Sequence, residues 1–360
     1  MWLQRLWLTD YRSYTEAELE LPPGLTAVQG VNGAGKTNLL EAVAYLATMG
    51  SFRGAPLDAL VRSGADTAIV RAEVDADGRA LLIEAEIGGR GGSRVQVNRQ
   101  RLQRSRDLLG ALRVSVFSPD DVELIKGGPS GRRRFLDEAV VADQPRLDQL
   151  RLDVERILRQ RGALLRQAGG RLSDDIGFTL DVWDDKLSTA GEQLAAARRS
   201  LLERLEPEID RAHRDLVGDD GATVELTYEA SWGGPLSEAL ATGRDDDVRR
   251  RATLRGPHRD ELGVRLAGLP ARTHASQGEQ RSLALAMRLG VHRLLTDRLD
   301  QAPVLLLDDV FSELDPDRSS ALLAHLPPGQ GLVTTAGPLP AAATPERVVR
   351  VDDGKLITEV

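Results

Sequence analysis

A glycine-rich segment near the N-terminus has residue types and spacing that suit phosphate chemistry. Residues 30–37 read G-V-N-G-A-G-K-T, which fits the pattern G-x-x-x-x-G-K-[S/T] of phosphate-binding loops. Glycines let the backbone curl around an anion with its N–H groups pointing inward. We expect Lys36 to reach the β- and γ-phosphates of a nucleoside triphosphate and the Thr37 hydroxyl to ligate Mg²⁺. The predicted nucleotide-binding residues of this loop are Gly30, Val31, Asn32, Gly33, Ala34, Gly35, Lys36 and Thr37.

Two adjacent carboxylates far along the chain supply the second half of this chemistry. An apolar stretch at Val304–Leu307, typical of a buried strand, runs directly into Asp308 and Asp309. We expect Asp308 to hold Mg²⁺, directly or through water. Asp309 is then placed to orient or deprotonate an attacking water. These two residues and Lys36 form the predicted catalytic set, because an ordinary strand end would explain the apolar run but not two carboxylates.

A third segment, Ser276–Gln280, reads S-Q-G-E-Q and precedes a predicted helix that continues to Leu294. Ser276 and Glu279 fit the capping box S-x-x-E, so the segment could simply begin a helix. Alternatively, the helix N-terminus is a second anion site, where Gly278 would let a phosphate approach closely. The residues alone leave both interpretations open.

The phosphate loop lies between two predicted elements that would position it. Leu25–Gln29 reads as a short strand, and Asn38–Ala47 reads as a helix whose positive dipole end faces the loop. Three alternating segments predict an antiparallel sheet beside the loop, at Thr67–Val74, Arg79–Ile87 and Arg94–Asn98.

A polar connection, D-Y-R-S-Y at Asp10–Tyr14, joins two further predicted strands, Leu3–Leu8 and Thr15–Leu21. Its Arg12 and Tyr14 could stack on a base, since guanidinium planes and aromatic rings both suit such contacts. Arg12 is therefore included among the predicted ATP-binding residues. A hairpin turn with exposed side chains explains the segment equally well.

The middle of the chain is helical and carries no chemical motif. Apolar spacing predicts helices over Leu147–Leu165 and Leu180–Leu216, and Pro207 is expected to kink or divide the second one. These helices look like an inserted lobe that packs as a bundle or hairpin. We therefore predict a discontinuous first lobe, residues 1–125 and 250–360, and a helical second lobe, residues 126–249.

The composition is that of a globular chain of 360 residues and excludes several classes of protein. Cysteine is absent, so no disulfide and no Cys-based metal site can form. No apolar stretch is long enough to cross a bilayer, and the N-terminus lacks an apolar leader, so a cytoplasmic protein is expected. The five histidines are scattered, which makes metal-dependent nuclease chemistry unexpected.

The charge is distributed unevenly. The chain carries −8 overall, but residues 99–166 contain 15 Lys or Arg and 10 Asp or Glu. Because screening limits exposed charges to about 8 Å at physiological salt, local patches decide whether DNA can bind. Arginines outnumber lysines 43 to four, which weakens this signal, and the arginines could equally form a solvated face. The predicted DNA contacts are Arg99, Arg101, Arg104, Arg132, Arg133 and Arg134.

The order of these motifs, followed by S-E-L-D at Ser312–Asp315, is similar to that of ABC-type ATPases. Among these the chain resembles the RecF family of bacterial DNA-repair ATPases, which are related to SMC proteins. The phosphate loop and the D-D strand are shared by a broad superfamily. The narrower signals are S-P-D-D-V-E-L-I-K-G-G-P-S-G-R-R-R-F-L-D at Ser118–Asp137 and G-P-H-R-D at Gly256–Asp260.

The resemblance implies an α/β fold: an ABC-type P-loop ATPase head, with a mixed sheet and an antiparallel β subdomain, plus an inserted, mainly helical second lobe. Two protomers would enclose two ATP molecules with Mg²⁺. The signature segment of one protomer would face the γ-phosphate at Lys36 of the other, with Asp315 near the dimer seam. In that segment the residues carried over are Ser276, Gln277, Gly278, Glu279 and Gln280.

The resemblance also implies a biological role. It indicates ATP-dependent binding to single- and double-stranded DNA, a weak DNA-stimulated ATPase, and a part in recombinational repair, replication and the SOS response. It further implies cooperation with RecR and RecO in loading RecA at gaps. The alternatives are another SMC-like ATPase of chromosome maintenance or the nucleotide-binding subunit of an ABC transporter.

Three departures from the wider ABC pattern concern the catalytic site. Asp309 stands where most ABC ATPases carry Glu. The switch histidine expected after Gly331–Thr335 is missing, and Thr334 or Thr335 occupies that region. No glutamine-loop residue is evident, and Asp120 or Asp121 lies in its place.

Overall fold

The computed structural model describes residues 1–76, 78–89, 92–218 and 222–358. The chain divides into two compact units. Unit 1 comprises Met1–Val122, Arg211–Gly221 and Gln277–Val360, and unit 2 comprises Glu123–Asp210 and Ala222–Ser276.

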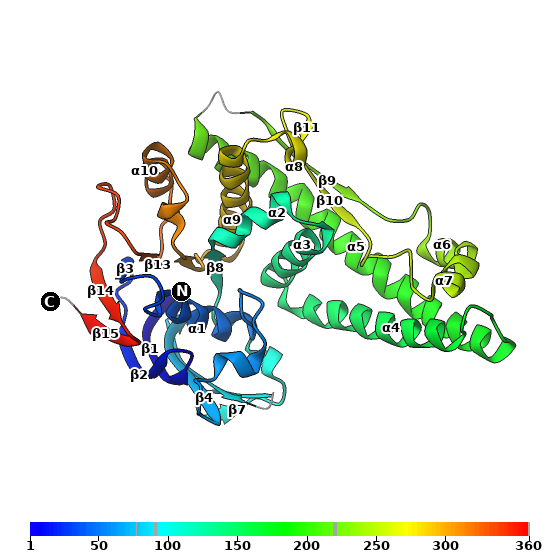
Figure 1. Cartoon of the computed structure of the whole chain (residues 1–360), viewed down its shortest axis with the longest axis horizontal. Coiled ribbons are helices and arrows are strands. Elements are labelled where there is room, and N and C mark those ends of the chain that lie inside the picture. The colour runs from blue at the N-terminus through cyan, green and yellow to red at the C-terminus, as the bar shows by residue number, and fades with distance from the viewer. Residues whose placement is uncertain (77, 90–91, 219–221, 359–360) are drawn as a thin grey trace. The chain divides into compact units, whose positions relative to one another are not determined.

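A mixed six-stranded sheet organises unit 1 (Figure 1). Its order is β15-β14-β3-β13-β12-β8, and only β15 runs antiparallel to its neighbour. Carboxyl ends of parallel strands meet at one edge, so the residues after β3, β12 and β13 are brought together. The strands are β3 (Leu25–Gln29), β8 (Val114–Phe117), β12 (Val304–Leu307), β13 (Gly331–Thr335), β14 (Arg347–Asp352) and β15 (Lys355–Thr358).

A second six-stranded sheet in unit 1 is wholly antiparallel, in the order β2-β1-β4-β5-β6-β7. Its strands alternate buried and exposed positions, as a sheet with one covered face requires. They are β1 (Trp2–Tyr11), β2 (Tyr14–Glu20), β4 (Thr67–Ala76), β5 (Arg79–Gly88), β6 (Ser93–Val97) and β7 (Gln100–Arg101).

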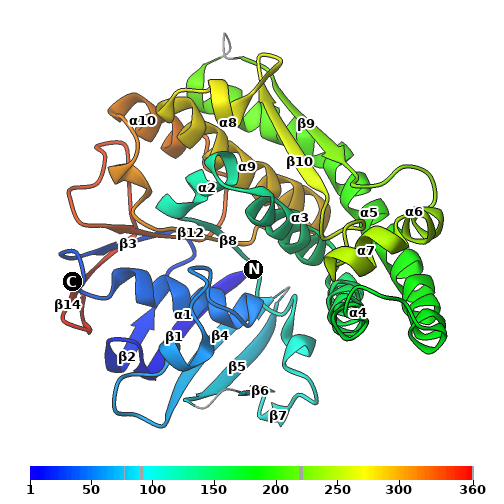
Figure 2. The same ribbon diagram turned by 45° about the vertical axis from the view of Figure 1, so that its right-hand side comes forward.

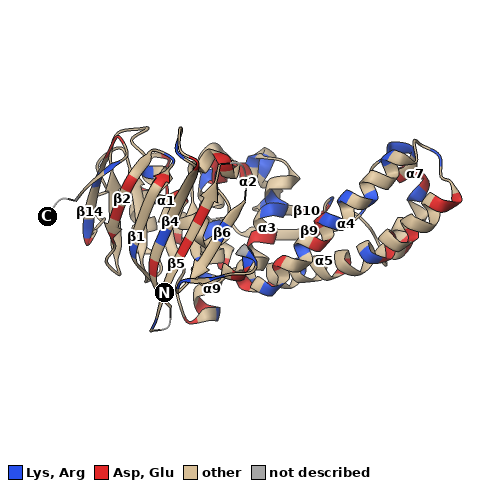
Figure 3. Cartoon of the chain, turned by 90° about the horizontal axis from the view of Figure 1, so that it is seen from below, with Lys and Arg blue, Asp and Glu red and all other residues tan. Residues whose placement is uncertain are grey.

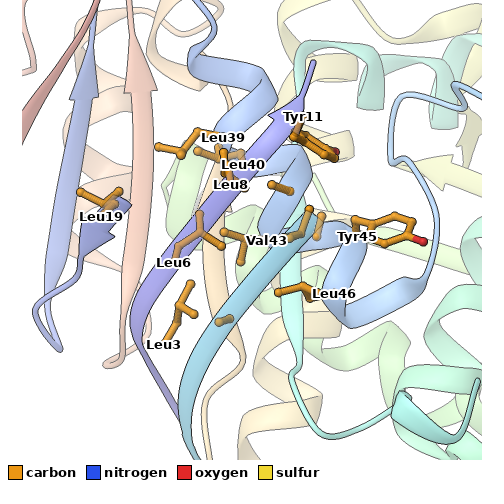
Figure 4. Packing of buried hydrophobic residues seen from close by; sticks show 14 of the residues in the cluster. Leu3, Leu6, Leu8, Tyr11, Leu19, Leu39, Leu40, Val43, Tyr45 and Leu46 are labelled. Carbon is orange, nitrogen blue, oxygen red and sulfur yellow. The ribbon is translucent and has the colours of Figure 1, made fainter. Parts of the chain in front are cut away.

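Helix α1 (Lys36–Thr48) belongs to the core of unit 1 and is buried at every position from Leu39 to Ala47. Leucines of β1 and α1 point toward one another in this core, as Figure 4 shows for Leu6, Leu8, Leu39 and Leu40. A helix that is apolar all round is stable only when it is covered on all sides. The element that follows the phosphate loop is therefore held firmly by its surroundings.

The remaining elements of unit 1 flank the mixed sheet. Helix α9 (Gln277–Leu299) contacts β8 and the short helix η3 (Pro119–Val122), and its buried His292 shares a 2.9 Å hydrogen bond with Ser115 Oγ. Burial lowers the pKa of His292 to about 4, so the ring is neutral. The other helices are η1 (Leu57–Leu60), η2 (Ser105–Leu108), η5 (Val310–Ser312) and α10 (Pro316–Ala324).

Unit 2 is mainly helical, with one three-stranded sheet of order β11-β10-β9 (Figure 2). Helix α5 (Asp174–Val217) continues from this unit into the first one, and Pro207 does not divide it. Two backbone N–H groups of β9 donate to Asp210 and Glu206 of α5. The helices are α2 (Glu123–Lys126), α3 (Pro129–Asp143), η4 (Pro145–Leu147), α4 (Asp148–Gln167), α6 (Leu236–Thr242), α7 (Arg244–Arg250) and α8 (Ala271–His274), and the strands are β9 (Val224–Glu229), β10 (Glu261–Leu266) and β11 (Leu269–Pro270).

A buried arginine joins the helices of unit 2. Arg161 of α4 is fully buried and pairs with Asp184 of α5 at 2.6 Å and with Asp247 of α7 at 2.7 Å. Its guanidinium also donates to Thr253 Oγ1 at 2.8 Å. Basic and acidic residues are interspersed along α4 and α5 (Figure 3). The predicted helices over 147–165 and 180–216 correspond to α4 and α5.

The two units do not have the same boundaries as the lobes predicted from the sequence. Residues 250–276, which were assigned to the first lobe, group with unit 2 because β10 pairs with β9 along its whole length. Residues 211–221, which were assigned to the second lobe, group with unit 1. Strand pairing between distant segments, which hydropathy does not reveal, accounts for the first difference.

Candidate functional site

The phosphate loop connects β3 to α1 at the edge of the mixed sheet. Gly30 N donates to Thr335 O at 3.3 Å, which ties the start of the loop to the end of β13. Gly35 has a φ of 115°, and a Cβ there would lie 2.7 Å from Ser13 Oγ. A side chain at Gly35 would therefore clash and strain the backbone, which explains this glycine.

Lys36 lies in the loop without an acidic partner. Its Nζ donates to Gly30 O at 2.8 Å and to Val31 O at 3.0 Å, and the residue is only 6% exposed. No carboxylate of the described residues forms an ion pair with it. Since both acceptors are neutral carbonyls, no residue that the structure describes neutralises the positive charge of Lys36.

Asp308 follows β12 and is 6% exposed. Its Oδ1 accepts hydrogen bonds of 2.8 Å from the Thr37 and Thr334 hydroxyls. Its Oδ2 has no hydrogen-bond partner among the described residues. Burial raises the pKa of Asp308 above its ordinary value, although the two hydroxyls oppose this shift. Carboxylate and hydroxyl oxygens are ligands that Mg²⁺ takes, so the pair Asp308 and Thr37 fits this ion.

Thr334 of β13 connects both acids of the D-D pair. Its hydroxyl donates to Asp308 Oδ1 and accepts from the backbone N–H of Asp309 at 2.8 Å. Asp309 has a φ of 47°, the left-handed region that non-glycine residues adopt less often. The side chain in the region of the missing histidine is therefore a neutral hydroxyl that fixes the turn after β12.

The connection between β1 and β2 contacts both the phosphate loop and helix α1. Arg12 donates from Nε and Nη2 to the buried Glu41 at 2.7 and 2.8 Å, and Ser51 Oγ donates to the same carboxylate. Tyr14 is fully buried and its hydroxyl donates to Gly35 O at 2.9 Å. The suggestion that Tyr14 stacks on a base is therefore wrong, and so is the alternative of an exposed turn side chain. Glu41 was not among the site residues predicted from the sequence. The one indication of its role there is that it is a charged residue within an otherwise apolar helix.

Residues Gln277–Gln280 of the signature segment and Asp315 belong to unit 1, whereas Ser276 is the last residue of unit 2. Residues Gln277–Gln280 form the first turn of α9, and Ser276 immediately precedes it. A Cβ at Gly278 would lie 2.8 Å from Arg318 Nη1, and Arg318 pairs with Asp315 at 3.2 Å. Asp315 also caps α10, because its Oδ1 accepts from Arg318 N at 2.8 Å.

The six predicted DNA-binding arginines differ in their surroundings. Arg99, Arg101 and Arg104 are exposed. Arg132 is 6% exposed, pairs with Glu261 at 2.8 Å, and donates to two carbonyls of unit 2. The guanidinium of Arg132 is therefore occupied by contacts within unit 2, which stabilise the fold. Arg132 is not proposed as a phosphate contact. Arg133 is half-buried, and Arg134 is exposed, 3.8 Å from Glu138.

Asp121, one of two residues in the place of the glutamine loop, pairs with Arg288 of α9 at 2.7 Å and accepts from Ser118 N. Across the described residues, no His, Asp and Glu side chains cluster in threes in a way that could hold a metal. None of the helices described is long and apolar enough to cross a membrane.

The sequence matches the family described as RecF/RecN/SMC N terminal domain over residues 2–334. A DNA replication and repair protein RecF from Streptomyces avermitilis is 45% identical over 352 residues, which cover 93% of each chain. A protein of the same name from Kineococcus radiotolerans is 43% identical and covers 98% of this chain and 97% of its own.

Solved structures show the same fold. The recombination mediator protein RecF-ATP in the RecFOR pathway aligns with a TM-score of 0.92 at 28% identity, covering 100% of this chain and 98% of its own. The Smc head bound to the C-winged helix domain of ScpA aligns over 100% of this chain and 98% of its own with a TM-score of 0.59 at 18% identity, a likeness in fold alone. The predicted fold class is confirmed: an ABC-type ATPase head with a mixed sheet, an antiparallel β subdomain and a mainly helical second lobe.

Proposed function

The chain belongs to the RecF group of the RecF/RecN/SMC family, and from this premise we propose that it is an ATP-dependent DNA-binding protein of replication and recombinational repair. Its close relatives are named DNA replication and repair proteins. The proposal further assigns it a weak, DNA-stimulated ATPase activity in the cytoplasm.

ATP is the proposed substrate and Mg²⁺ the proposed metal. Lys36 and the N–H groups of residues 30–37 would bind the β- and γ-phosphates. Asp308 and Thr37 would hold Mg²⁺, which neutralises charge on the phosphate oxygens when it is bound. Asp309 would orient the attacking water, and the products are ADP and phosphate. Arg12, which pairs with Glu41 beside the loop, is also proposed to contact the bound ATP.

The strongest support is a pair of unneutralised charges of opposite sign at one sheet edge. Among the described residues, Lys36 Nζ donates only to carbonyls, and the side chain of Asp308 accepts only from hydroxyls, with the charge of Arg53 a minor influence on its pKa. A buried charge that lacks a charged partner is costly, and chains usually avoid it. A magnesium triphosphate would satisfy both charges at once, because it offers an anion to the lysine and a cation to the aspartate.

We propose that ATP joins two copies of the chain. The segment Ser276–Gln280 of one copy would approach the γ-phosphate at Lys36 of the other, with Asp315 at the seam. Gly278 and Asp315 both lie beside Arg318, so the two predicted contact points belong to one surface of unit 1. Hydrolysis would then release the dimer.

DNA is the proposed macromolecular partner, and the exposed arginines Arg99, Arg101 and Arg104 are proposed contacts in unit 1. RecR and RecO are proposed as protein partners in loading RecA at gaps, because a similar structure belongs to the RecFOR pathway. A membrane partner is not part of the proposal.

The substitution Lys36→Met tests the nucleotide proposal. Losing charge-assisted hydrogen bonds should weaken ATP binding at least about tenfold to a hundredfold. The variant should also lose ATP-dependent dimers and the retention of DNA, measured by light scattering and by DNA-binding assays. Dimers and DNA binding that persist without ATP binding would contradict the proposal.

A second variant, Ser276→Arg, separates the two halves of the site. It should bind ATP as the wild type does but fail to dimerise, because the arginine would block the approach of the other copy. Loss of ATP binding in Ser276→Arg would instead mean that this residue acts within its own protomer.

A further inference from the structure

Two segments that distinguish this chain from other ABC-type ATPases meet within unit 2. They are the start of α3, where Arg132 to Arg134 lie, and the loop Gly256–Asp260. Arg133 Nη1 donates to Asp260 O at 2.8 Å. Arg198 of α5 joins the same region, because it donates to both carboxylate oxygens of Asp137 and to Pro257 O at 2.7 Å.

The loop Gly256–Asp260 is fixed at both ends. Ser231 Oγ forms 3.0 Å hydrogen bonds with the backbone N–H and C=O of Gly256. The carboxylate of the fully buried Asp260 accepts from the Tyr228 hydroxyl and from Ser231 N. His258 Nε2 contacts Thr253 O at 3.0 Å, and burial lowers the pKa of this ring to about 4, so it is neutral. The side chain of Arg259 is thus carried on a rigid backbone.

Each carboxylate near this loop already has a partner. Glu261 pairs with Arg132, Asp137 pairs with Arg198, and Asp260 accepts from Tyr228. The guanidinium groups of Arg133 and Arg259 take part in none of these pairs. Neither lies within ion-pair distance of a carboxylate in the part of the chain that the structure describes.

Arg133 and Arg259 are instead held by neutral carbonyls. Arg133 is anchored to Asp260 O, and Arg259 Nε donates to Thr253 O at 3.3 Å. Arg259 is exposed and Arg133 half-buried. Burial first, then the charge of Arg198, lower the pKa of Arg133, with a smaller contribution from Arg259, while Glu261 and Asp260 oppose the shift. Like charges held close together in this way repel one another, and an anion between them would relieve that repulsion.

We propose that Arg133 and Arg259 form a phosphate-binding site on unit 2 that contacts the sugar–phosphate backbone of DNA. This inference rests on the proposed DNA-binding function. Guanidinium groups bind phosphate oxygens through paired, charge-assisted hydrogen bonds, and anchoring by a carbonyl leaves the remaining N–H groups of each arginine for that purpose. Because backbone contacts read no bases, the site contributes affinity and orientation, not sequence preference.

The test compares DNA binding by the full-length protein and by the variant Arg133→Ala/Arg259→Ala, with ATP and Mg²⁺ present and a short duplex as the probe. Affinity should fall about tenfold to a hundredfold at low salt. The slope of log affinity against log salt should become shallower by about 1.8, because two phosphate contacts are lost. ATP binding and ATP-dependent dimerisation should match the wild type.

Two further variants make the result specific. The control Arg156→Ala/Arg249→Ala removes two exposed arginines of unit 2 that are paired with Asp153 and Asp246, and it should bind DNA as the wild type does. The single variant Arg259→Ala removes an exposed side chain, so its binding loss cannot come from misfolding if its thermal unfolding is unchanged. Excess inorganic phosphate or pyrophosphate serves as a competitor that separates a general anion site from one for nucleic acid.

The outcomes separate this inference from the proposed function. If the wild type binds DNA and the double variant binds it with equal affinity and equal salt slope, the site is overturned while the function stands. If the wild type fails to bind DNA at all, the proposed function fails first. Loss of ATP binding in the double variant, or complete displacement of DNA by millimolar phosphate alone, would also overturn the assignment to the DNA backbone.

Discussion

Buried carboxylates are satisfied in opposite ways in the two units. In unit 2, Asp184 and Asp247 face the guanidinium of Arg161 at 2.6 and 2.7 Å. In unit 1, Asp308 is buried to a similar degree but receives only the hydroxyls of Thr37 and Thr334. The first arrangement balances its charge within the chain, whereas the second does not.

This difference distinguishes a structural charge from a functional one. An aspartate paired with an arginine can remain buried at little further cost, and its role is to hold helices in place. An aspartate held by neutral donors keeps a net negative charge, which a cation from outside can meet. Burial raises the pKa of both Asp308 and Asp247, so it is the hydrogen-bond and ion-pair partners that distinguish the two aspartates.

The largest effect on stability is expected when the buried guanidinium of Arg161 in unit 2 is removed. Arg161→Met should cost about 3–5 kcal/mol in the free energy of unfolding, because Asp247 is left buried without its cation. Denaturant unfolding measures this loss. The matched control is Arg156→Met on the same helix, whose exposed pair with Asp153 should be worth about 0–1 kcal/mol. Equal effects of the two substitutions would contradict the assigned role of Arg161.

An intermediate effect is expected at the hydroxyl that holds the D-D pair. Thr334→Val keeps the shape but removes the donor to Asp308 and the acceptor for Asp309 N, which should cost about 1–3 kcal/mol. ATP hydrolysis should fall by more than ATP binding, since the turn that carries Asp309 is released. Thr334→Ser should restore both properties. A Val variant with wild-type hydrolysis would show that Thr334 only fills space.

The smallest effect on stability is expected at Asp308 itself. Its raised pKa means that the folded state binds a proton more tightly than the unfolded state. Without Mg²⁺, the stability of the wild type should therefore fall as pH rises from the ordinary value of 3.8 through the raised pKa.

Asp308→Asn should show a smaller fall, because the buried Asp247, whose pKa is also raised, still titrates in the variant. Its stability at neutral pH should lie within about 1 kcal/mol of the wild type. The same variant should lose the Mg²⁺ dependence of ATP binding. If the stability of Asp308→Asn depended on pH as that of the wild type does, another group would be responsible for the titration. The contrast drawn between Asp308 and the paired aspartates of unit 2 would then lose its support.

The parts of this molecule that the sequence predicts well are those encoded locally. The phosphate loop, the strand that ends in Asp308 and the helices α4 and α5 each depend on neighbouring residues, so spacing and hydropathy are sufficient. Tyr14 and Arg132 were misjudged because their partners are distant in the chain. Tyr14 donates to Gly35 O, and Arg132 pairs with Glu261, 129 positions away.

The predicted boundary near residue 250 differs from the division into units for a similar reason: residues 250–276 group with unit 2, where β10 pairs with β9 and where Arg161 and Arg198 contact Thr253 and Pro257. Conversely, the link between Thr334 and both aspartates follows from the parallel register of β12 and β13, which places Leu307 beside Val333. The family resemblance pointed to the region of Thr334 and Thr335, but it could not predict the hydrogen bonds that Thr334 forms with the two aspartates.

The burial of α1 has a consequence for motion. Its amides from Leu39 to Ala47 lie in a covered helix, so their exchange with solvent deuterium requires opening of the core of unit 1. We therefore expect these amides to exchange more slowly than those of the exposed loop residues Val31 to Gly33, which hydrogen–deuterium exchange would measure.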